Sequence, residues 1–405
     1  MDSSTGNLVK RFGTPLYLYR LPTARAAALS LSLALPEQTQ LLYSVRANPH
    51  PRLVAEFVRG GLGCEVASTA ELKVILAAGL PLHRCLFTVG LSTVDDLSLA
   101  LMSGVHRFSV DSLAGLRALE AAARSCTLEA EYLIRLNHLG PRNSDSDDPI
   151  PESMAEFGFS PDSLHTAPTV FRASDMLTPV GFRIRSGGNV VDTGTLMRKF
   201  DRSLGLAARI LREARIRPYV IDVGGGFAAP FAKPGRRPVY AGMARHLSRS
   251  LDRHLPSWRA GQPVVAFASG RYLVAECGVL LTRVVDTAGG CAALDADASA
   301  LGGALGQGRV MERSWPARAE SGALTHKSFP TRSPSTSSAT LRGPWLPRQP
   351  RVGDILEIPN VGAYGLGTHT LATGAARPVE VVVDDGDEVV SVRPVEVVSS
   401  EMPRA

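Results

Sequence analysis

Short apolar runs rich in β-branched residues alternate with helical patterns from about residue 41 to residue 270. This alternation predicts βαβ units, in which consecutive strands lie parallel and a helix crosses between them. Eight such units close into a (β/α)8 TIM barrel, which places the chain in the α/β class. The expected strands are residues 41–46, 64–67, 85–89, 107–110, 132–136, 181–184, 219–223 and 264–268. The helices between them include residues 69–78, 94–102, 112–123, 195–213 and 241–255.

The pattern changes after residue 270, where helical periodicity is weak. Turn signals separate β-branched runs at residues 272–287, 351–359 and 378–398. These runs predict a separate C-terminal all-β domain, which an N-terminal strand at residues 14–19 is expected to join. We therefore expect a barrel over residues 22–268 and a β-rich domain formed by residues 1–21 together with residues 269–405.

Two segments interrupt these patterns. Residues 139–171, rich in Pro, Ser and Asp, predict a loop insertion before the sixth barrel strand. Residues 328–350 are rich in Pro, Ser and Thr. Such a composition cannot bury much apolar surface, so it predicts a mobile loop or a disordered insertion.

Composition excludes several classes of function. The chain has 405 residues, a hydrophobic fraction of 44% and a mean hydropathy of +0.05, as expected of a soluble globular protein. Its formal charge is +6, but the arginines are mixed with acids and form no basic run, so we expect no nucleic-acid binding. No apolar run approaches the ~20 residues that span a bilayer, and the N-terminus lacks a signal sequence. We expect a cytoplasmic protein without membrane contact.

The cysteines predict neither disulfides nor a metal site. They show no CxxC or metal-like spacing, and they are best explained as small buried residues in a reducing compartment. The five are Cys64, Cys85, Cys126, Cys277 and Cys291.

Two stretches have the properties of a ligand site. In LLYSVRANPH, residues 41–50, a strand-like run is stopped by Pro49. This places Arg46 at the carboxyl end of a strand, where barrel folds carry their chemistry. The run Gly224–Gly226 directly follows another strand, and glycine lets the backbone approach an anion and aim N–H groups at it. A tight turn without a ligand is the alternative explanation for these glycines.

Several segments together resemble a known family. They are FGTPLYLY at 12–19, LLYSVRANPH at 41–50, GLGCEVASTAEL at 61–72, IDVGGGF at 221–227, SGRYLVAECG at 269–278 and VGDILEIPNVGAYG at 352–365. In this order they resemble the fold-type III pyridoxal-phosphate decarboxylases, the diaminopimelate and ornithine decarboxylase group. The resemblance implies an alanine racemase-like barrel with a C-terminal β domain, pyridoxal phosphate as cofactor, and a homodimer in which the second subunit completes the active site.

The same resemblance implies which residues would bind the phosphate of the cofactor. They are the backbone of Gly224, Gly225 and Gly226, the guanidinium of Arg271 and the hydroxyl of Tyr364. Gly188 stands where a phosphate-binding serine is common in the family.

The departures from the family pattern fall on the residues that carry chemistry. Arg46 replaces the lysine that forms the imine with the cofactor. Arg185, in GFRIRSGG, stands at the position of the ring-stacking histidine, and Ala268 at that of the glutamate that pairs with the pyridine nitrogen. A guanidinium stays protonated and has no free lone pair, so Arg46 cannot form an imine. It can still hold a phosphate or a carboxylate.

These departures predict a diverged or degenerate decarboxylase-family protein that no longer performs imine-based decarboxylation of amino acids. The expected ligand is an amino acid or a phosphorylated small molecule, with pyridoxal phosphate held noncovalently. Three alternatives remain open at this point. The chain is an active lyase or epimerase with noncovalent pyridoxal phosphate or a changed mechanism, a pseudoenzyme that regulates an active homologue, or a barrel for another phosphorylated ligand.

Overall fold

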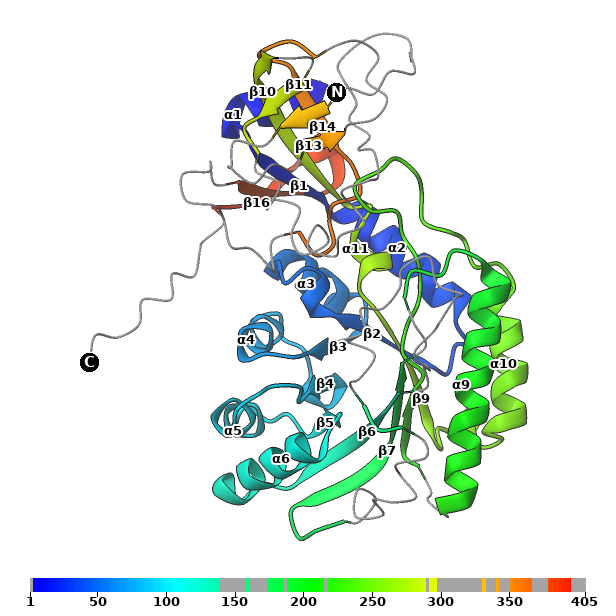
Figure 1. The fold of residues 1–405 in the computed structure, drawn as a ribbon. Coiled ribbons are helices and arrows are strands. Elements are labelled where there is room, and N and C mark those ends of the chain that lie inside the picture. The colour runs from blue at the N-terminus through cyan, green and yellow to red at the C-terminus, as the bar shows by residue number, and fades with distance from the viewer. Residues whose placement is uncertain are drawn as a thin grey trace. The chain divides into compact units, whose positions relative to one another are not determined.

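The computed structural model describes residues 3–137, 158–160, 173–185, 188–214, 218–288, 291–296, 330–332, 340–342, 350–365 and 378–394. The chain divides into two compact units (Figure 1). The barrel unit consists of residues 25–228 and 238–273, and the sheet unit of residues 1–24, 229–237 and 274–405. Most of the predicted insertions at 139–171 and 328–350 lie outside the described residues.

Eight parallel strands close the barrel, which confirms the predicted fold. Each strand pairs with its neighbours in chain order, and the last strand pairs with the first, since Leu42 of β2 lies opposite Ala268 of β9. The strands are β2 Gln40–Ser44, β3 Gly63–Val66, β4 Cys85–Thr88, β5 Arg107–Val110, β6 Ala130–Asn137, β7 Leu177–Arg185, β8 Val220–Asp222 and β9 Val264–Ser269.

Helices surround these strands, with α3 to α6 on one side and α9 and α10 on the other (Figure 1). Their first turns are stabilised by side chains that cap free N–H groups: Ser68 before α4, Thr93 before α5 and Ser112 before α6. The helices are α2 Leu21–Ala34, α3 Pro51–Arg59, α4 Thr69–Ala77, α5 Val94–Met102, α6 Leu113–Cys126, α9 Thr193–Ala214, α10 Met243–His254 and the short α11 Arg271–Val274.

An apolar cluster fills part of the barrel interior. It contains Leu42, Leu86, Leu133, Val180, Val220, Ala266 and Ala268, all buried. These residues alternate along their strands with side chains that face the helices, because successive residues of a strand point to opposite faces. The inward side chains thus form a packed core that supports the polar site described below.

The sheet unit is built on a mixed sheet in the order β13-β12-β11-β10-β1-β15-β16, with β14 paired to β10. The N-terminal strand β1 Leu16–Arg20 joins this sheet, as predicted, and it lies between β10 and β15. Helix α1 Ser3–Phe12 packs Leu8 and Val9 against this sheet. The remaining strands are β10 Gly278–Ala288, β11 Cys291–Leu294, β12 Pro330–Arg332, β13 Thr340–Arg342, β14 Ile355–Ile358, β15 Val379–Val383 and β16 Val389–Pro394.

Two local predictions were wrong, and one helix was not predicted. Arg46 does not end a strand, because β2 stops at Ser44 and Val45–Ala47 form a 3-10 turn. Residues 272–274 belong to helix α11 rather than to a strand, and β10 begins only at Gly278. The helix Ser3–Phe12 was not predicted, although Leu8, Val9 and Phe12 recur at helical spacing.

Candidate functional site

Three barrel strands each place one charged side chain in the interior of the barrel. Glu65 comes from β3, Arg183 from β7 and Asp222 from β8. Their side chains are 4%, 14% and 1% exposed. Charges this deeply buried require partners, because their transfer from water is strongly unfavourable. The three residues supply these partners to one another.

Glu65 is the centre of this group. Its Oε1 lies 2.7 Å from Arg183 Nη2 and accepts a hydrogen bond from Arg46 Nη2 at 3.0 Å. Its Oε2 accepts a hydrogen bond from Ser44 Oγ at 2.7 Å. Burial alone would raise the pKa of Glu65, but the two guanidinium groups hold it far below its usual range. Glu65 is therefore a fixed anion at neutral pH.

Asp222 connects this group to the glycine turn. Its Oδ2 lies 3.2 Å from Arg183 Nε, and its Oδ1 accepts a hydrogen bond from Gly224 N at 2.8 Å. Burial raises the pKa of Asp222 to about 6, although Arg183 and the Gly224 N–H both oppose this rise. Arg183 keeps its proton because the carboxylates of Glu65 and Asp222 outweigh the effect of burial on its pKa. Asp222 thus changes charge close to neutral pH.

Arg46 lies at the edge of this network. The 3-10 turn after β2 carries it, and its side chain is 41% exposed, far more than that of Arg183. Its hydrogen bond to the buried Glu65 orients the guanidinium. A guanidinium has five N–H donors in a planar fork. One edge of Arg46 can therefore remain on Glu65 while another receives an anion from solvent.

The backbone conformation of the predicted phosphate cradle requires glycine. Gly224 and Gly226 have positive φ angles of 79° and 124°, which side-chain-bearing residues rarely adopt. A methyl group on Gly225 would lie 2.3 Å from the carbonyl oxygen of Ala268. The Ala268 N–H also donates to the Gly224 carbonyl at 2.9 Å, so the turn is held against the end of β9.

The end of β9 also packs against the turn that carries Arg46. A Cβ atom on Gly270 would lie 2.7 Å from the Cβ of Ala47. Arg271 follows directly, as the first residue of α11. The structure thus brings together the segments that carry Arg46, Arg271 and the glycine turn, which were predicted to share one site.

The other predicted site residues lie in different surroundings. Ala268 is buried in the apolar cluster of the barrel. Arg185 is the last residue of β7, opposite Asn137, and its side chain lies outside the described part of the chain. Gly188 has nothing within 4 Å of a Cβ built on it, so packing does not require glycine there. Tyr364, with a positive φ of 58°, belongs to the sheet unit.

The sequence analysis missed Glu65, Arg183 and Asp222 as a group. Each of them lay inside a segment already noted, in GCEV, GFRI and VIDV. The signal was a single charged residue inside a run that otherwise suits a buried strand, which is an exception to the usual exclusion of charge from protein interiors.

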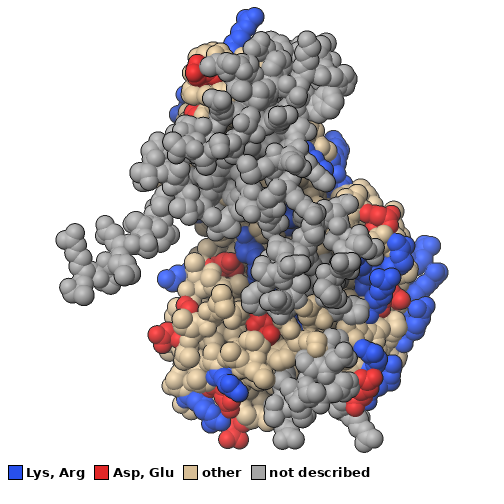
Figure 2. Space-filling view, viewed as in Figure 1, with Lys and Arg blue, Asp and Glu red and all other residues tan. Residues whose placement is uncertain are grey.

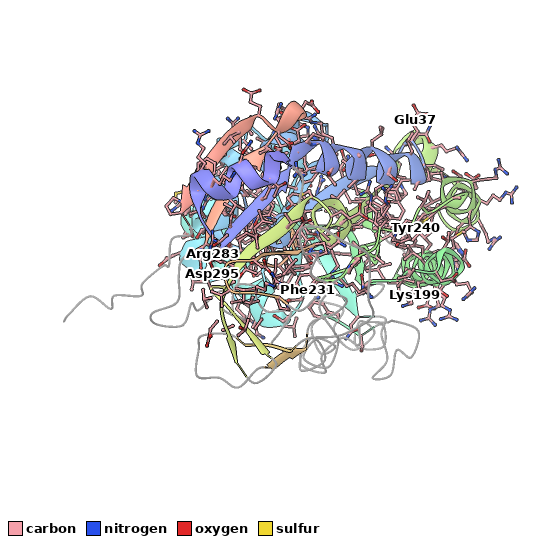
Figure 3. All side chains as sticks on the ribbon, turned by 90° about the horizontal axis from the view of Figure 1, so that it is seen from above. Glu37, Lys199, Phe231, Tyr240, Arg283 and Asp295 are labelled. Atoms are coloured by element: carbon pink, nitrogen blue, oxygen red, sulfur yellow. The ribbon has the colours of Figure 1, made fainter. Side chains whose placement is uncertain are left out.

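Lysine is absent from the described carboxyl ends of the barrel strands. Lys10 lies on α1, Lys73 on α4, Lys199 on α9 (Figure 3) and Lys233 in the sheet unit, while Lys327 is not described. The described residues also contain no cluster of His, Cys, Asp and Glu that could hold a metal ion. Across the same residues, every helix is too short or too polar to span a bilayer.

Comparisons with known proteins agree with this fold. Residues 23–275 match the family model described as pyridoxal-dependent decarboxylase, pyridoxal binding domain. The diaminopimelate decarboxylase of Actinosynnema pretiosum subsp. auranticum is 28% identical over 398 residues, which cover 95% of this chain and 87% of that protein.

Solved structures resemble the whole chain. The diaminopimelate decarboxylase of Helicobacter pylori, complexed with L-lysine, has a TM-score of 0.79 at 21% identity and covers 97% of this chain and 96% of its own. A lysine/ornithine decarboxylase of Vibrio vulnificus, complexed with putrescine, has a TM-score of 0.74 at 20% identity and covers 95% of this chain and 98% of its own.

Proposed function

Because the chain belongs to the family of pyridoxal-dependent decarboxylases, we propose that it binds a phosphate-bearing small molecule at the carboxyl ends of its barrel strands without forming a lysine imine. Pyridoxal phosphate is the first ligand to test, because it is the family's cofactor. The protein is then a diverged member of the family that does not perform imine-based decarboxylation. The single observation that carries this proposal is the hydrogen bond from Arg46 to the buried Glu65.

The bond to Glu65 supports a binding role for Arg46 over a covalent one. Glu65 holds the side chain of Arg46 at the carboxyl ends of the barrel strands through a salt bridge. A protonated guanidinium cannot attack an aldehyde, whereas it binds phosphate and carboxylate through paired N–H donors. Arg46 therefore acts as an anion receptor at the position where the family resemblance places a nucleophilic amine.

Pyridoxal phosphate fits the residues present at its phosphate end but not at its reactive end. Arg271 provides guanidinium donors for an anion, and the glycine turn provides backbone donors other than the Gly224 N–H, which already donates to Asp222. The resemblance puts Ala268 beside the pyridine nitrogen, and this alanine is buried among apolar side chains. Without a carboxylate there, the ring is a poor electron sink, which is the chemistry that this cofactor supplies to decarboxylases.

Two relatives indicate the class of small molecule that accompanies such a site. Their structures contain L-lysine and putrescine, an amino acid and a diamine. We propose an amino acid as the second ligand of this chain, with its carboxylate on Arg46. A homodimer, as the resemblance implies, belongs to the same proposal.

Borohydride reduction in the presence of pyridoxal phosphate tests the absence of an imine. Reduction converts an imine into a stable pyridoxyl-lysine, which peptide mass spectrometry locates. We expect no such adduct on any single lysine. A stoichiometric adduct on Lys233 or Lys327 would show that another lysine has taken over the role, and the proposal would be wrong.

Calorimetric titration with pyridoxal phosphate and with inorganic phosphate tests the binding site. We expect the wild type to bind both, and Arg271→Ala to lose about 1.5–3 kcal/mol, the usual contribution of a hydrogen bond to a charged group. Arg117→Ala is the matched control, because Arg117 is an exposed arginine on helix α6 and does not belong to the proposed ligand site. Failure of the wild type to bind either ligand at millimolar concentration would remove the proposed function and leave a regulatory role as the alternative.

A further inference from the structure

The outer faces of α9 and α10 carry a concentration of arginine that the proposed ligand site does not use. The two helices are in contact, since Ser250 of α10 donates a hydrogen bond to Asp201 of α9. Figure 2 shows Lys and Arg side chains gathered over these helices. We call this surface the arginine face. It consists of Arg198, Arg202, Arg209 and Arg212 on α9 and Arg245, Arg249 and Arg253 on α10, all exposed.

Helical geometry aligns these arginines into two rows. An α-helix turns by about 100° per residue, so spacings of four, seven and three residues place the four arginines of α9 within an arc of about 80°. The three arginines of α10 are spaced by four residues and cover a similar arc. Figure 3, seen from above, shows side chains with nitrogen tips that point outward from both helices. The α9 row is about 21 Å long at 1.5 Å per residue.

The charge of the arginine face is poorly compensated within the chain. The two helices contain seven exposed arginines and three carboxylates, Asp201, Glu213 and Asp252. Asp252 is occupied by Arg259, which donates to both of its oxygens at 2.9 Å. Asp201 accepts from Ser250 and lies 3.6 Å from Arg253. In the described part of the chain, Arg209, Arg212, Arg245 and Arg249 form no ion pair.

This arrangement is unfavourable for the isolated protein. Arginines four residues apart on a helix repel each other, by roughly 0.2–0.5 kcal/mol per pair. Helix α10 has no acidic residue in its first turn, where a carboxylate would interact well with the helix dipole, whereas Asp192 caps the start of α9. Other arginines of the barrel unit have carboxylate partners: Arg59 pairs with Glu56 and Arg124 with Glu120. The arginine face thus carries an unmatched positive charge that a negatively charged surface would complement.

We propose that the arginine face is a docking surface for an acidic helix of another protein, whose carboxylates follow a spacing of three to four residues. Such a helix presents a row of carboxylates about as long as the α9 row, and it can lie between the two arginine rows. Arginine suits this partner because its planar fork binds a carboxylate through two parallel N–H donors. Charge complementarity of this kind mainly accelerates association and selects the partner.

The composition of the face favours a protein over a nucleic acid. Single strands need exposed aromatic side chains on which bases stack. Phe200, the only Phe, Tyr or Trp in the two helices, is fully buried. Glu213 is exposed within the face and would repel the phosphates that a duplex presents at every step. An acidic helix can place an uncharged residue opposite this carboxylate.

A designed peptide pair provides the test, with fluorescence anisotropy of the labelled peptide at about 0.15 M salt as the measurement. The first peptide is a helix of about 21 residues with glutamates in one row at a spacing of three to four. The second peptide has the same composition, with its glutamates distributed around the helix. We expect the full-length protein to bind the first peptide at least about fivefold more tightly than the second.

Charge reversal locates the binding surface. Arg209→Glu together with Arg249→Glu should weaken binding of the first peptide by about tenfold or more. The matched control is Lys73→Glu together with Arg117→Glu, which changes the net charge equally on α4 and α6, where both side chains are exposed. The control should bind the peptide like the wild type. Circular dichroism confirms that both variants are folded.

Three results would overturn the proposal. Equal losses in the two double variants would show attraction by net charge alone. Equal binding of the two peptides would show that the rows do not recognise spacing. Tighter binding of a duplex DNA of similar length than of the first peptide would assign the face to nucleic acid. None of these results depends on the ligand of the barrel, so this inference and the proposed function are tested separately.

Discussion

Replacement of Arg183 by methionine tests whether the buried charge network holds the barrel together. Arg183 faces two carboxylates, at 2.7 Å from Glu65 and 3.2 Å from Asp222, and both are nearly inaccessible to water. Removal of one member of a buried ion pair typically reduces stability by about 3–5 kcal/mol, because a buried charge is left without compensation. Glu65 would keep Arg46, Ser44 and Thr88 as partners. Asp222 would keep the Gly224 N–H.

We therefore expect a loss near the lower end of this range, about 3 kcal/mol at pH 7.5. For a unit of this size, such a loss lowers the midpoint of thermal unfolding by about 6–12 °C. The loss should be smaller at pH 5. Without Arg183 the pKa of Asp222 in the folded protein rises further above its unfolded value, so a proton neutralises Asp222 at low pH and the penalty is removed.

Urea unfolding at both pH values is the measurement. The control is Arg117→Met, which removes an exposed arginine and should change stability by no more than about 0.5 kcal/mol. The double variant with Arg183→Met and Asp222→Asn should recover part of the loss at pH 7.5, because it lacks the uncompensated carboxylate. If Arg183→Met alone loses less than about 1 kcal/mol at pH 7.5, the network does not stabilise the barrel as argued.

Three further predictions concern the same site. The wild type should lose stability, of the order of 2 kcal/mol, as the pH rises from about 4 to 6, because a carboxyl group with a raised pKa in the folded state favours the fold only while it is protonated. Asp222→Asn should remove this pH-dependent loss. Urea unfolding of both proteins across this pH range is the measurement, and equal pH dependence in the two proteins would contradict the assignment. Arg46→Lys alone should not give ordinary enzyme turnover, about 1–10³ per second, on lysine, ornithine or diaminopimelate, because Ala268 and Arg185 remain and catalytic groups act as a unit. Release of CO₂ is the measurement, and release at such a rate would contradict the proposal that the chain is a diverged member of the family. Gly225→Ala should weaken or abolish binding of inorganic phosphate in calorimetry, because its methyl group would lie 2.3 Å from the Ala268 carbonyl oxygen and displace the turn. Gly188→Ala is the control. Its methyl group would have no atom within 4 Å, so this variant should bind phosphate like the wild type.

Local sequence patterns were sufficient for most elements of the barrel. Helix α5 was predicted with the bounds observed, Val94–Met102, because a capping residue, acidic residues in the first turn and a regular apolar spacing all lie within a few residues of one another. The strands were found within one or two residues at most ends for a similar reason, since β-branched runs bounded by turn residues are local signals. The glycine turn was likewise identified from a run of three consecutive glycines after a strand.

Only the tertiary structure decided which charged residues act together. Glu65, Arg183 and Asp222 lie on β3, β7 and β8, up to 157 positions apart in the sequence. No local signal links them, because their proximity results from closure of the barrel, which turns alternate side chains of every strand toward one axis. The sequence did not indicate that Glu65 is the partner of Arg46, for the same reason. It also did not indicate that the two rows of the arginine face lie together. Helices α9 and α10 are separated in sequence by β8 and become neighbours only when β8 takes its place in the barrel wall. The residue types of the site can be read along the chain, but their distances, and therefore their charges and pKa values, depend on contacts between distant strands.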